Sequence, residues 1–319
     1  MRRFTCPVCS ATLSFENSVC LSCAAAVGYQ RSQVAMAEPG PETAICDQLD
    51  VNGCNWLVEE ADESRCLSCR LTRTRPRDED EAGTRQWRLA EAAKRRLVFG
   101  LDELRLPVRI SDGFVGIAVD LLSSTQAPVT TGYHNGVITV DLAEADLAVR
   151  TRRQQQLAEP YRTMLGHLRH EFGHYYDEVL VAGNPLQERY VEVFGDPSTP
   201  YEQALRRHYD QGPPPDWHQH YVSAYASMHP TEDFAECLAH YQHIQDTLQT
   251  ASQWGLTTGT YPDTATPFDQ VLHDAWLPTS VALNEINRSM GSPDLYPFVL
   301  SETVIAKLGY VGEVVASAS

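Results

Sequence analysis

His170-Glu171-Phe172-Gly173-His174 is the stretch of this 319-residue chain whose residue types and spacing most directly suggest chemistry. It fits the pattern His-Glu-x-x-His. On a helix, positions i and i+4 lie on one face, so both imidazoles can bind one Zn²⁺ ion. The glutamate after the first histidine then lies beside the metal, where it can act as general base toward a zinc-activated water. The pattern predicts a catalytic zinc at His170 and His174, with Glu171 as the base.

The stretch must be helical for this chemistry to work. Pro160 suits the first turn of a helix, and apolar residues then recur with roughly helical spacing as far as Leu180. Gly183-Asn-Pro185 is a helix-stop signal. We therefore expect a mostly buried helix of about twenty residues. The alternative is a core helix whose two histidines are only hydrogen-bonded, but a buried His-Glu-His cluster without a metal would need several compensating partners.

A zinc of this kind needs a third protein ligand and keeps its fourth position for water. Glu232 and Glu236 lie four residues apart in a second expected helix that begins at Pro230. We expect Glu232 to bind the metal and Glu236 to accept a hydrogen bond from a ligand imidazole. The reverse assignment stays open. So does a purely structural role, because acidic residues in a first turn favour the helix dipole without any metal.

Other side chains near these two helices could take part. Tyr225 and His229, just ahead of the second helix, are candidate donors to the oxygen that gains negative charge during hydrolysis, and His134 is a third. Packing or capping is the alternative for each. His167, one turn before His170, could be a ligand, a substrate-binding group or a hydrogen-bond donor to the site. A histidine with a satisfied hydrogen bond is the simpler interpretation of His167.

Eight of the nine cysteines fall within the first 69 residues, in two groups. The first group consists of two Cys-x-x-Cys knuckles, Cys6, Cys9, Cys20 and Cys23. Each knuckle places two thiolates on one side of a metal, so the pair predicts a zinc ribbon. The second group has one Cys-x-x-Cys and predicts another four-thiolate zinc site: Cys46, Cys54, Cys66 and Cys69. We therefore expect two structural zinc ions beside the catalytic one.

A disulfide framework is the rival interpretation of these cysteines. The chain starts Met-Arg-Arg-Phe-Thr-Cys, with no apolar signal segment. Cytosolic thiols stay reduced, so we expect a cytoplasmic protein with metal-bound thiolates. No apolar run approaches the roughly 18 residues that a membrane span requires. The formal net charge of -17 disfavours general binding to nucleic acid or to an anionic membrane.

The order of the expected elements predicts an α+β fold. A helix is expected over residues 86–99, followed by strands over 106–110, 115–119 and 137–140, the last after the hairpin-turn dipeptide Asn135-Gly136. Strands thus come before the first zinc-site helix, and helices dominate after it. The expected layout begins with a zinc ribbon over residues 1–34, a second cysteine module over 40–75 and a polar linker over 76–84. A metallopeptidase domain over 85–312 and a frayed tail over 313–319 follow.

At this point several motifs together resemble those of the bacterial zinc-binding metallopeptidases with an N-terminal zinc-ribbon domain. Besides the cysteine modules, the resemblance rests on Cys54-Asn-Trp56, Ala93-Lys-Arg-Arg-Leu97, Thr131-Gly-Tyr-His-Asn-Gly-Val-Ile-Thr139, Glu159-Pro-Tyr-Arg162, Leu165-Gly-His-Leu-Arg-His-Glu-Phe-Gly-His-Tyr-Tyr176, Phe194-Gly195, Val222-Ser-Ala-Tyr-Ala-Ser227 and His229-Pro-Thr-Glu-Asp233. The resemblance implies a zincin-like, gluzincin-type domain with His170, His174 and a downstream glutamate on zinc.

The resulting function hypothesis is a zinc metallopeptidase that hydrolyses a peptide or protein substrate. The rival is a zinc-stabilised adaptor whose cysteine modules bind a protein partner and whose protease body is degenerate. The intact Glu171 argues against the rival, because a purely structural zinc site has no use for an acid beside the metal. Metal content separates the two hypotheses: the peptidase requires three zinc ions per chain, one of them removable with loss of activity.

Overall fold

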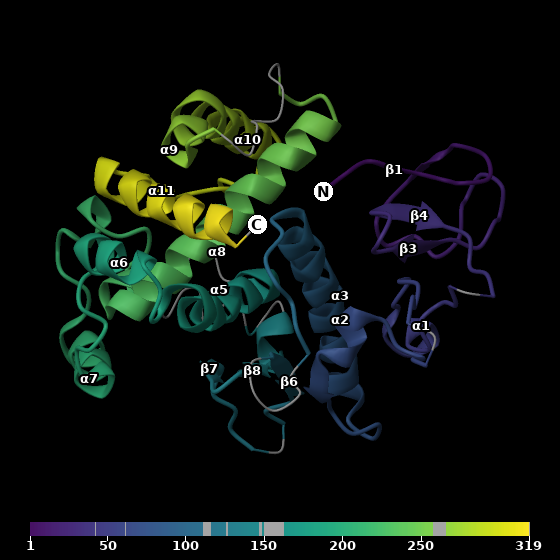
Figure 1. Cartoon of the computed structure of the whole chain (residues 1–319), viewed down its shortest axis with the longest axis horizontal. Coiled ribbons are helices and arrows are strands. Elements are labelled where there is room, and N and C mark those ends of the chain that lie inside the picture. Colours follow the sequence, from purple (N-terminus) through teal and green to yellow (C-terminus); the bar gives the residue numbers. More distant parts are fainter. Residues whose placement is uncertain are drawn as a thin grey trace.

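The computed structural model describes residues 1–41, 43–60, 62–110, 116–125, 127–146, 149, 163–257 and 266–318. The fold is mixed α/β, with the cysteine-rich part at the N-terminal end. In Figure 1 the long helix α3 (Glu81–Glu103) lies between the purple and blue N-terminal modules and the teal, green and yellow helices of the rest of the chain. Within the described residues every strand precedes the helix that carries His170, as the α+β prediction requires.

A four-stranded sheet has the order β5-β6-β8-β7. Its strands are β5 (Thr72–Thr74), β6 (Ala118–Leu122), β7 (Gly132–His134) and β8 (Val137–Asp141). β5, β6 and β8 are parallel, and β7 is an antiparallel edge strand. Asn135 and Gly136 have φ of 47° and 75°, which suits the tight turn between β7 and β8. The predicted hairpin and the strand over 137–140 are confirmed.

The N-terminal part consists of two small hairpins and two short helices. They are β1 (Phe4–Thr5) with β2 (Thr12–Leu13), β3 (Gly28–Gln30) with β4 (Ala35–Ala37), α1 (Leu49–Asn52) and α2 (Leu67–Arg70). A bridge between Tyr29 and Trp56 joins the two cysteine modules. The module boundary that we expected at residue 34 is wrong, because it would cut the β3–β4 hairpin.

An aromatic cluster joins these modules to α3. Phe99 of α3 has its ring centroid 5.1 Å from that of Phe15, 5.7 Å from that of Tyr29 and 6.1 Å from that of Phe4. Each of these rings is buried. Edge-on aromatic pairs at such distances stabilise beyond the area that they bury. The cysteine modules therefore share a hydrophobic core with the body of the protein.

The remaining helices surround α8 (Pro230–Gln253). They are α5 (Met164–Tyr176), its π-helical continuation η2 (Asp177–Val181), α6 (Leu186–Phe194), α7 (Tyr201–Gln211), α9 (Phe268–Val271), the π-helical η5 (Leu272–Trp276), α10 (Leu277–Ser289) and α11 (Glu302–Ser317). The short 3-10 helices are η1 (Leu142–Ala145), η3 (Trp217–Gln219) and η4 (Tyr225–Ser227). Pro230 begins α8 as predicted. The hydroxyl of Thr163 caps α5 by accepting from the Gly166 N–H, and the expected start at Pro160 lies outside the described residues.

The C-terminal helix braces the start of α8 through a buried ion pair. Lys307 of α11 donates to Asp233 at 2.5 Å and to the carbonyl of His220 at 2.8 Å. Val314 and Val315 near the end of the same helix are buried. The frayed tail that we expected from residue 313 is therefore wrong up to Ser317, because these valines pack in the core.

The expected linker over 76–84 also needs correction at both sides. Before it, Thr72–Thr74, which we placed at the end of the second cysteine module, pairs with β6 as an edge strand of the body. Within it, α3 already begins at Glu81, because the Asp80 carboxylate caps the helix by accepting from the Gly83 N–H at 2.8 Å. Only the stretch between Thr74 and Asp80 connects the two elements.

The strands expected over 106–110 and 115–119 form only in part. The structure has a single bridge between Ile110 and Ile117, followed by β6 from Ala118. Pro107 has no N–H to donate to a ladder, and its carbonyl accepts from the hydroxyl of Tyr176 instead. Residues 111–115 lie outside the described residues. Among the helices that are described, none is both long and apolar enough to cross a membrane.

Phe99→Ala should lower the free energy of unfolding by about 3–5 kcal/mol, because its ring fills the core between the modules and α3. Leu89→Ala, on the same helix but 58% exposed, is the control and should change stability by less than about 0.5 kcal/mol. Urea unfolding would be followed by helical circular dichroism and by zinc release to a coloured chelator. Equal stability of the two variants would contradict a shared core.

Candidate metal centre and active site

The two helices that carry the histidines and glutamates cross at unusually short range. A Cβ atom on Gly173 of α5 would lie 2.7 Å from the Cα of Ala235 in α8. Real Cβ atoms do not approach another backbone so closely, so only glycine fits at this position of the crossing. The close crossing is what allows carboxylates on α8 to reach imidazoles on α5.

Three side-chain atoms converge beside this crossing. His170 Nε2 lies 2.9 Å from Glu232 Oε2 and 3.2 Å from His174 Nε2, and His174 Nε2 lies 3.4 Å from Glu232 Oε2. Zinc bonds of about 2.0–2.2 Å in a tetrahedron separate ligand atoms by about 3.3–3.6 Å. At 2.9–3.4 Å the three atoms lie somewhat closer together than that, and they form a group that could hold one metal ion. The structure thus brings together the three residues predicted as ligands, His170, His174 and Glu232.

Glu236 lies behind His170 rather than in this group of three. His170 Nδ1 donates to Glu236 Oε1 at 2.7 Å. Nε2 of the same ring is thereby directed at the point between the three converging atoms, which we call the convergence point. Burial acts to raise the pKa of Glu236, but its hydrogen bond with His170 prevails and lowers that pKa to about 2. Burial likewise opposes a charge on His170, but Glu232 and Glu236 outweigh it and raise the pKa of the imidazole well above its ordinary value. The site is built to hold positive charge.

Glu171 differs from the other carboxylates of the site. It is only 5% exposed, and within the described part of the chain its Oε2 atom has no hydrogen-bond partner. Burial raises its pKa above that of an ordinary glutamate. A buried carboxylate oxygen without a partner is costly. Such a group is suited to exchange a proton with a molecule that enters the site.

These residues line a cavity of about 460 Å³, within the usual size range of ligand sites. Its walls come from α5, η2, the edge strand β7, the start of α7, η4 and the first turn of α8. The residues that line the cavity are Thr131, Gly132, Tyr133, His170, Glu171, His174, Asp177, Glu178, Ala182, Tyr201, Tyr225, Thr231 and Glu232.

Two tyrosines on the cavity wall lie beside the expected metal ligands, one at Glu232 and one at His170. Tyr201 donates to Glu232 Oε1 at 2.9 Å, which leaves Oε2 for the convergence point. Tyr225 lies with its ring centroid 6.0 Å from that of His170, and burial raises the pKa of its phenol, so it remains a hydrogen-bond donor. Tyr225 was expected near the site. Tyr201 was not, because no motif or spacing links it to Glu232.

The structure corrects the expectation for His229. Its Nε2 donates to the Thr199 carbonyl at 2.9 Å, and its Nδ1 accepts from the Thr231 N–H at 3.2 Å as the N-cap of α8. Both ring nitrogens are occupied and the residue does not line the cavity. His229 is a capping residue and not a donor to a reacting oxygen.

His134 and His167 also lie outside the group of three. His134 is exposed on β7 and pairs with the Asn135 side chain at 3.0 Å. His167 Nε2 lies 3.7 Å from Glu144 Oε2, so it has a local acidic neighbour of its own. Neither residue lines the cavity, and neither contributes an atom to the convergence point.

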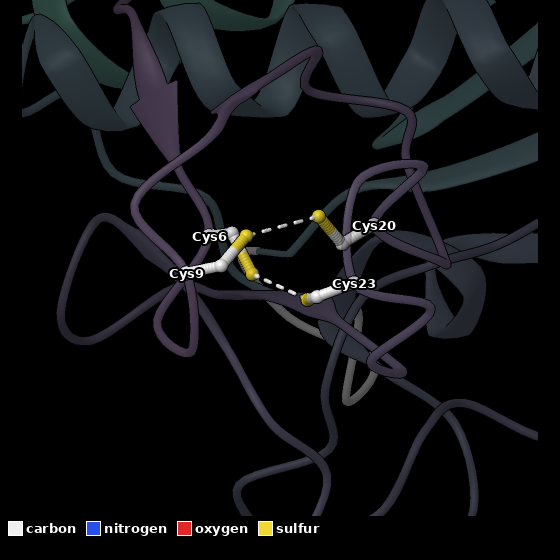
Figure 2. Close-up of side chains that lie close together, drawn as sticks. All are labelled: Cys6, Cys9, Cys20 and Cys23. Atoms are coloured by element: carbon white, nitrogen blue, oxygen red, sulfur yellow. Dashed lines mark hydrogen bonds between the residues drawn. The ribbon is translucent and has the colours of Figure 1, made fainter.

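The first four-cysteine group also has metal geometry. Figure 2 shows the four thiols facing one another, with Cys6 Sγ 3.7 Å from Cys23 Sγ and Cys9 Sγ 3.6 Å from Cys20 Sγ. Zinc–sulfur bonds of about 2.3 Å in a tetrahedron give about 3.8 Å. The backbone N–H groups of Cys23 and Ser22 lower the pKa of the Cys20 thiol to about 6, which favours the thiolate that binds metal.

The second group is fully buried. Cys46, Cys54, Cys66 and Cys69 bring their sulfur atoms to within 4.8 Å of one another. Arg95 of α3 donates to the carbonyls of the α1 turn next to Cys54. The two four-cysteine zinc sites predicted from the sequence are thus assembled, and α3 holds the second one against the body.

Comparison with known proteins agrees with these sites. The family model described as "Putative zinc-binding metallo-peptidase" matches residues 83–314, and a zinc-ribbon domain model matches residues 3–80. Uncharacterized proteins of Mycobacterium bovis and of two Mycobacterium tuberculosis strains are 46% identical over 327 residues, covering 99% of this chain and 95% of each relative. No solved structure matches the chain. The matches confirm the resemblance found in the sequence motifs.

Gly173→Ala should destabilise the protein by about 1–2 kcal/mol. Overpacking at the crossing costs about 1–3 kcal/mol, which exceeds the gain of up to about 1 kcal/mol from replacing a helical glycine by alanine. Gly309→Ala in α11, where an added Cβ meets nothing within 4 Å, is the control and should stabilise. Thermal unfolding of both variants checks the prediction, and equal shifts of the same sign would refute the tight crossing.

Glu232→Ala and Glu236→Ala should affect metal binding differently. Loss of Glu232 removes one of three converging atoms and should empty the His170–His174 site at metal concentrations that fill the wild type. Loss of Glu236 leaves the three atoms in place and should weaken affinity by about 10–100-fold. Chelator competition measures both, with the two cysteine sites as an internal reference for protein integrity. A larger loss for Glu236→Ala would exchange the two roles.

Proposed function

The chain belongs to the family of putative zinc-binding metallo-peptidases, and from this premise we propose that it hydrolyses peptide bonds with a zinc ion bound at His170, His174 and Glu232. The observation that carries the proposal is the position of Glu171. Glu171 lines the same cavity as the three converging side chains, and among the described residues its buried Oε2 atom has no hydrogen-bond partner. A structural metal site would not require such an acid.

Side chains of this chain would supply both the ligands of the ion and the hydrogen bonds that orient those ligands. His170 and His174 would each offer Nε2, and Glu232 would offer Oε2, while Glu236 and Tyr201 keep His170 and Glu232 oriented. A zinc ion bound there would act as a Lewis acid and would lower the pKa of a water molecule bound to it. Two further zinc ions would hold the cysteine modules.

Glu171 and Tyr225 would act directly on the reacting atoms. Glu171 accepts a proton from the attacking water and later donates it to the leaving amine. Tyr225 keeps its hydroxyl proton, because burial raises its pKa, and it lies on the cavity wall. It would donate a hydrogen bond to the carbonyl oxygen as that oxygen gains negative charge.

Glu171→Gln tests the proposal. The amide has nearly the same shape but cannot accept the proton, so peptide hydrolysis should fall by about 10²–10⁴-fold while folding and the zinc content of three ions per chain persist. Hydrolysis would be measured by mass spectrometry of a peptide library, with Glu188→Gln on the exposed face of α6 as the control. Wild-type hydrolysis by the Glu171→Gln variant would exclude Glu171 as the base.

The adaptor function is the second candidate, and one observation favours it. Leu21 and Val8, at the tips of the two cysteine knuckles, are 92% and 53% exposed, and exposed apolar side chains on a small rigid module suit a protein partner. The two functions differ in measurable terms. An adaptor needs metal only at the cysteines, whereas the peptidase needs a third, chelator-sensitive zinc and loses hydrolysis with it.

A further inference from the structure

The cavity has an acidic end that the proposed chemistry does not use. Directly after α5, the chain continues as the π-helical segment η2, in which the Ala182 N–H donates to the Asp177 carbonyl at 2.9 Å. Such segments insert an extra residue into a helical turn and recur at functional sites. Here the segment contributes Asp177 and Glu178 to the cavity wall, and Ala182, the residue directly after it, also lines the cavity.

Glu178 is held in place by a hydrogen bond, and neither carboxylate pairs with a lysine or arginine among the described residues. Glu178 Oε2 accepts from the Tyr133 hydroxyl at 2.5 Å, and that hydroxyl in turn accepts from the Gly136 N–H at 3.1 Å. Edge strand β7 is thereby tied to η2. Among the described residues, neither Asp177 nor Glu178 has a basic partner, and no lysine or arginine lines the cavity. Within the part of the chain that the structure describes, no lysine or arginine therefore balances the charge of this acidic end.

A second feature points to a ligand in this cavity. Glu171 lines the cavity, and its buried Oε2 atom has no hydrogen-bond partner in the described part of the chain. Asp177 follows the expected ligand His174 by three residues, which is about 4.5 Å along a helix. One residue of an extended peptide spans about 3.3–3.6 Å. A group one residue away from the bond at the metal centre can therefore reach Asp177 and Glu178.

We propose that Asp177 and Glu178 form a subsite for a cationic nitrogen of the peptide substrate, carried by a residue next to the cleaved bond. This inference rests on the proposed peptidase function, whose substrate class it names. The formal net charge of -17 agrees with it, since an acidic protein attracts cationic peptides over a distance. The nitrogen belongs either to a lysine or arginine side chain or to the free N-terminal ammonium of the peptide.

Three peptides of otherwise identical sequence separate these two sources. The first is N-acetylated and carries lysine next to the bond, the second carries norleucine in its place, and the third carries norleucine with a free N-terminus. Binding is measured by fluorescence anisotropy on the zinc-loaded Glu171→Gln protein, and cleavage on the protein with Glu171 intact. The variants are Asp177→Asn, Glu178→Gln, their combination, and Glu188→Gln as an exposed control on α6.

We expect a cationic peptide to bind about tenfold more tightly than acetylated norleucine peptide, and the double variant to lose that preference. Raising the ionic strength should weaken the preference in the protein with both carboxylates. The Glu188→Gln control should keep it. A preference for the lysine peptide assigns the subsite to side chains, and one for the free amine assigns it to the N-terminus.

The inference is overturned if the norleucine and cationic peptides bind alike, or if the double variant keeps the preference while its zinc content and melting temperature match the control. Because binding is measured without hydrolysis, the fate of the subsite does not depend on turnover. If the protein with Glu171 intact cleaves none of the three peptides, that result would count against the peptidase function alone.

Discussion

The site depends on one steric constraint, the contact between the backbones of α5 and α8 at Gly173 and Ala235. Because a side chain is missing on α5, the two helices approach closely enough for short acidic side chains to bridge them. Glu232 and Glu236 then lie on either side of the same imidazole. A wider crossing would separate the groups and deprive the carboxylates of Glu232 and Glu236 of their partner His170. The packing of two helices thus determines the electrostatics of the cavity.

Buried charged groups also hold α8 and the second cysteine module in place. Lys307 of α11 contacts Asp233, the residue next to Glu232, in a buried ion pair, while Arg95 of α3 fixes the loop before Cys54. Breaking one partner of a buried pair is costly because the other charge is left without compensation. Such contacts specify one arrangement of elements that are distant in sequence. Site and scaffold are therefore parts of one packed unit.

The sequence predicted those features that depend on local spacing. His170, Glu171 and His174 share a helical face by their spacing alone, and the Cys-x-x-Cys spacing by itself predicts a metal site. Asn135-Gly136 forms its turn through local backbone conformation. Features that depend on tertiary contacts were missed. Tyr201 reaches Glu232 only because the start of α7 lies beside the first turn of α8. Nε2 of His229 is hydrogen-bonded because the tertiary fold places the Thr199 carbonyl beside it. The tail was wrong for the same reason, since small residues after Gly312 gave no hint of the core that buries them.

The two cysteine groups differ in exposure, and this difference bears on how fast each could exchange its metal. In the first group Cys9 and Cys23 face solvent, whereas all four cysteines of the second are buried. An exposed thiolate can be attacked by oxidants or competing thiols in the folded protein. A buried one becomes accessible only when its surroundings open, a much rarer event. Under oxidative stress the outer module would therefore lose its ion first and loosen, while the inner module would stay intact on α3, giving the chain one redox-labile and one inert metal.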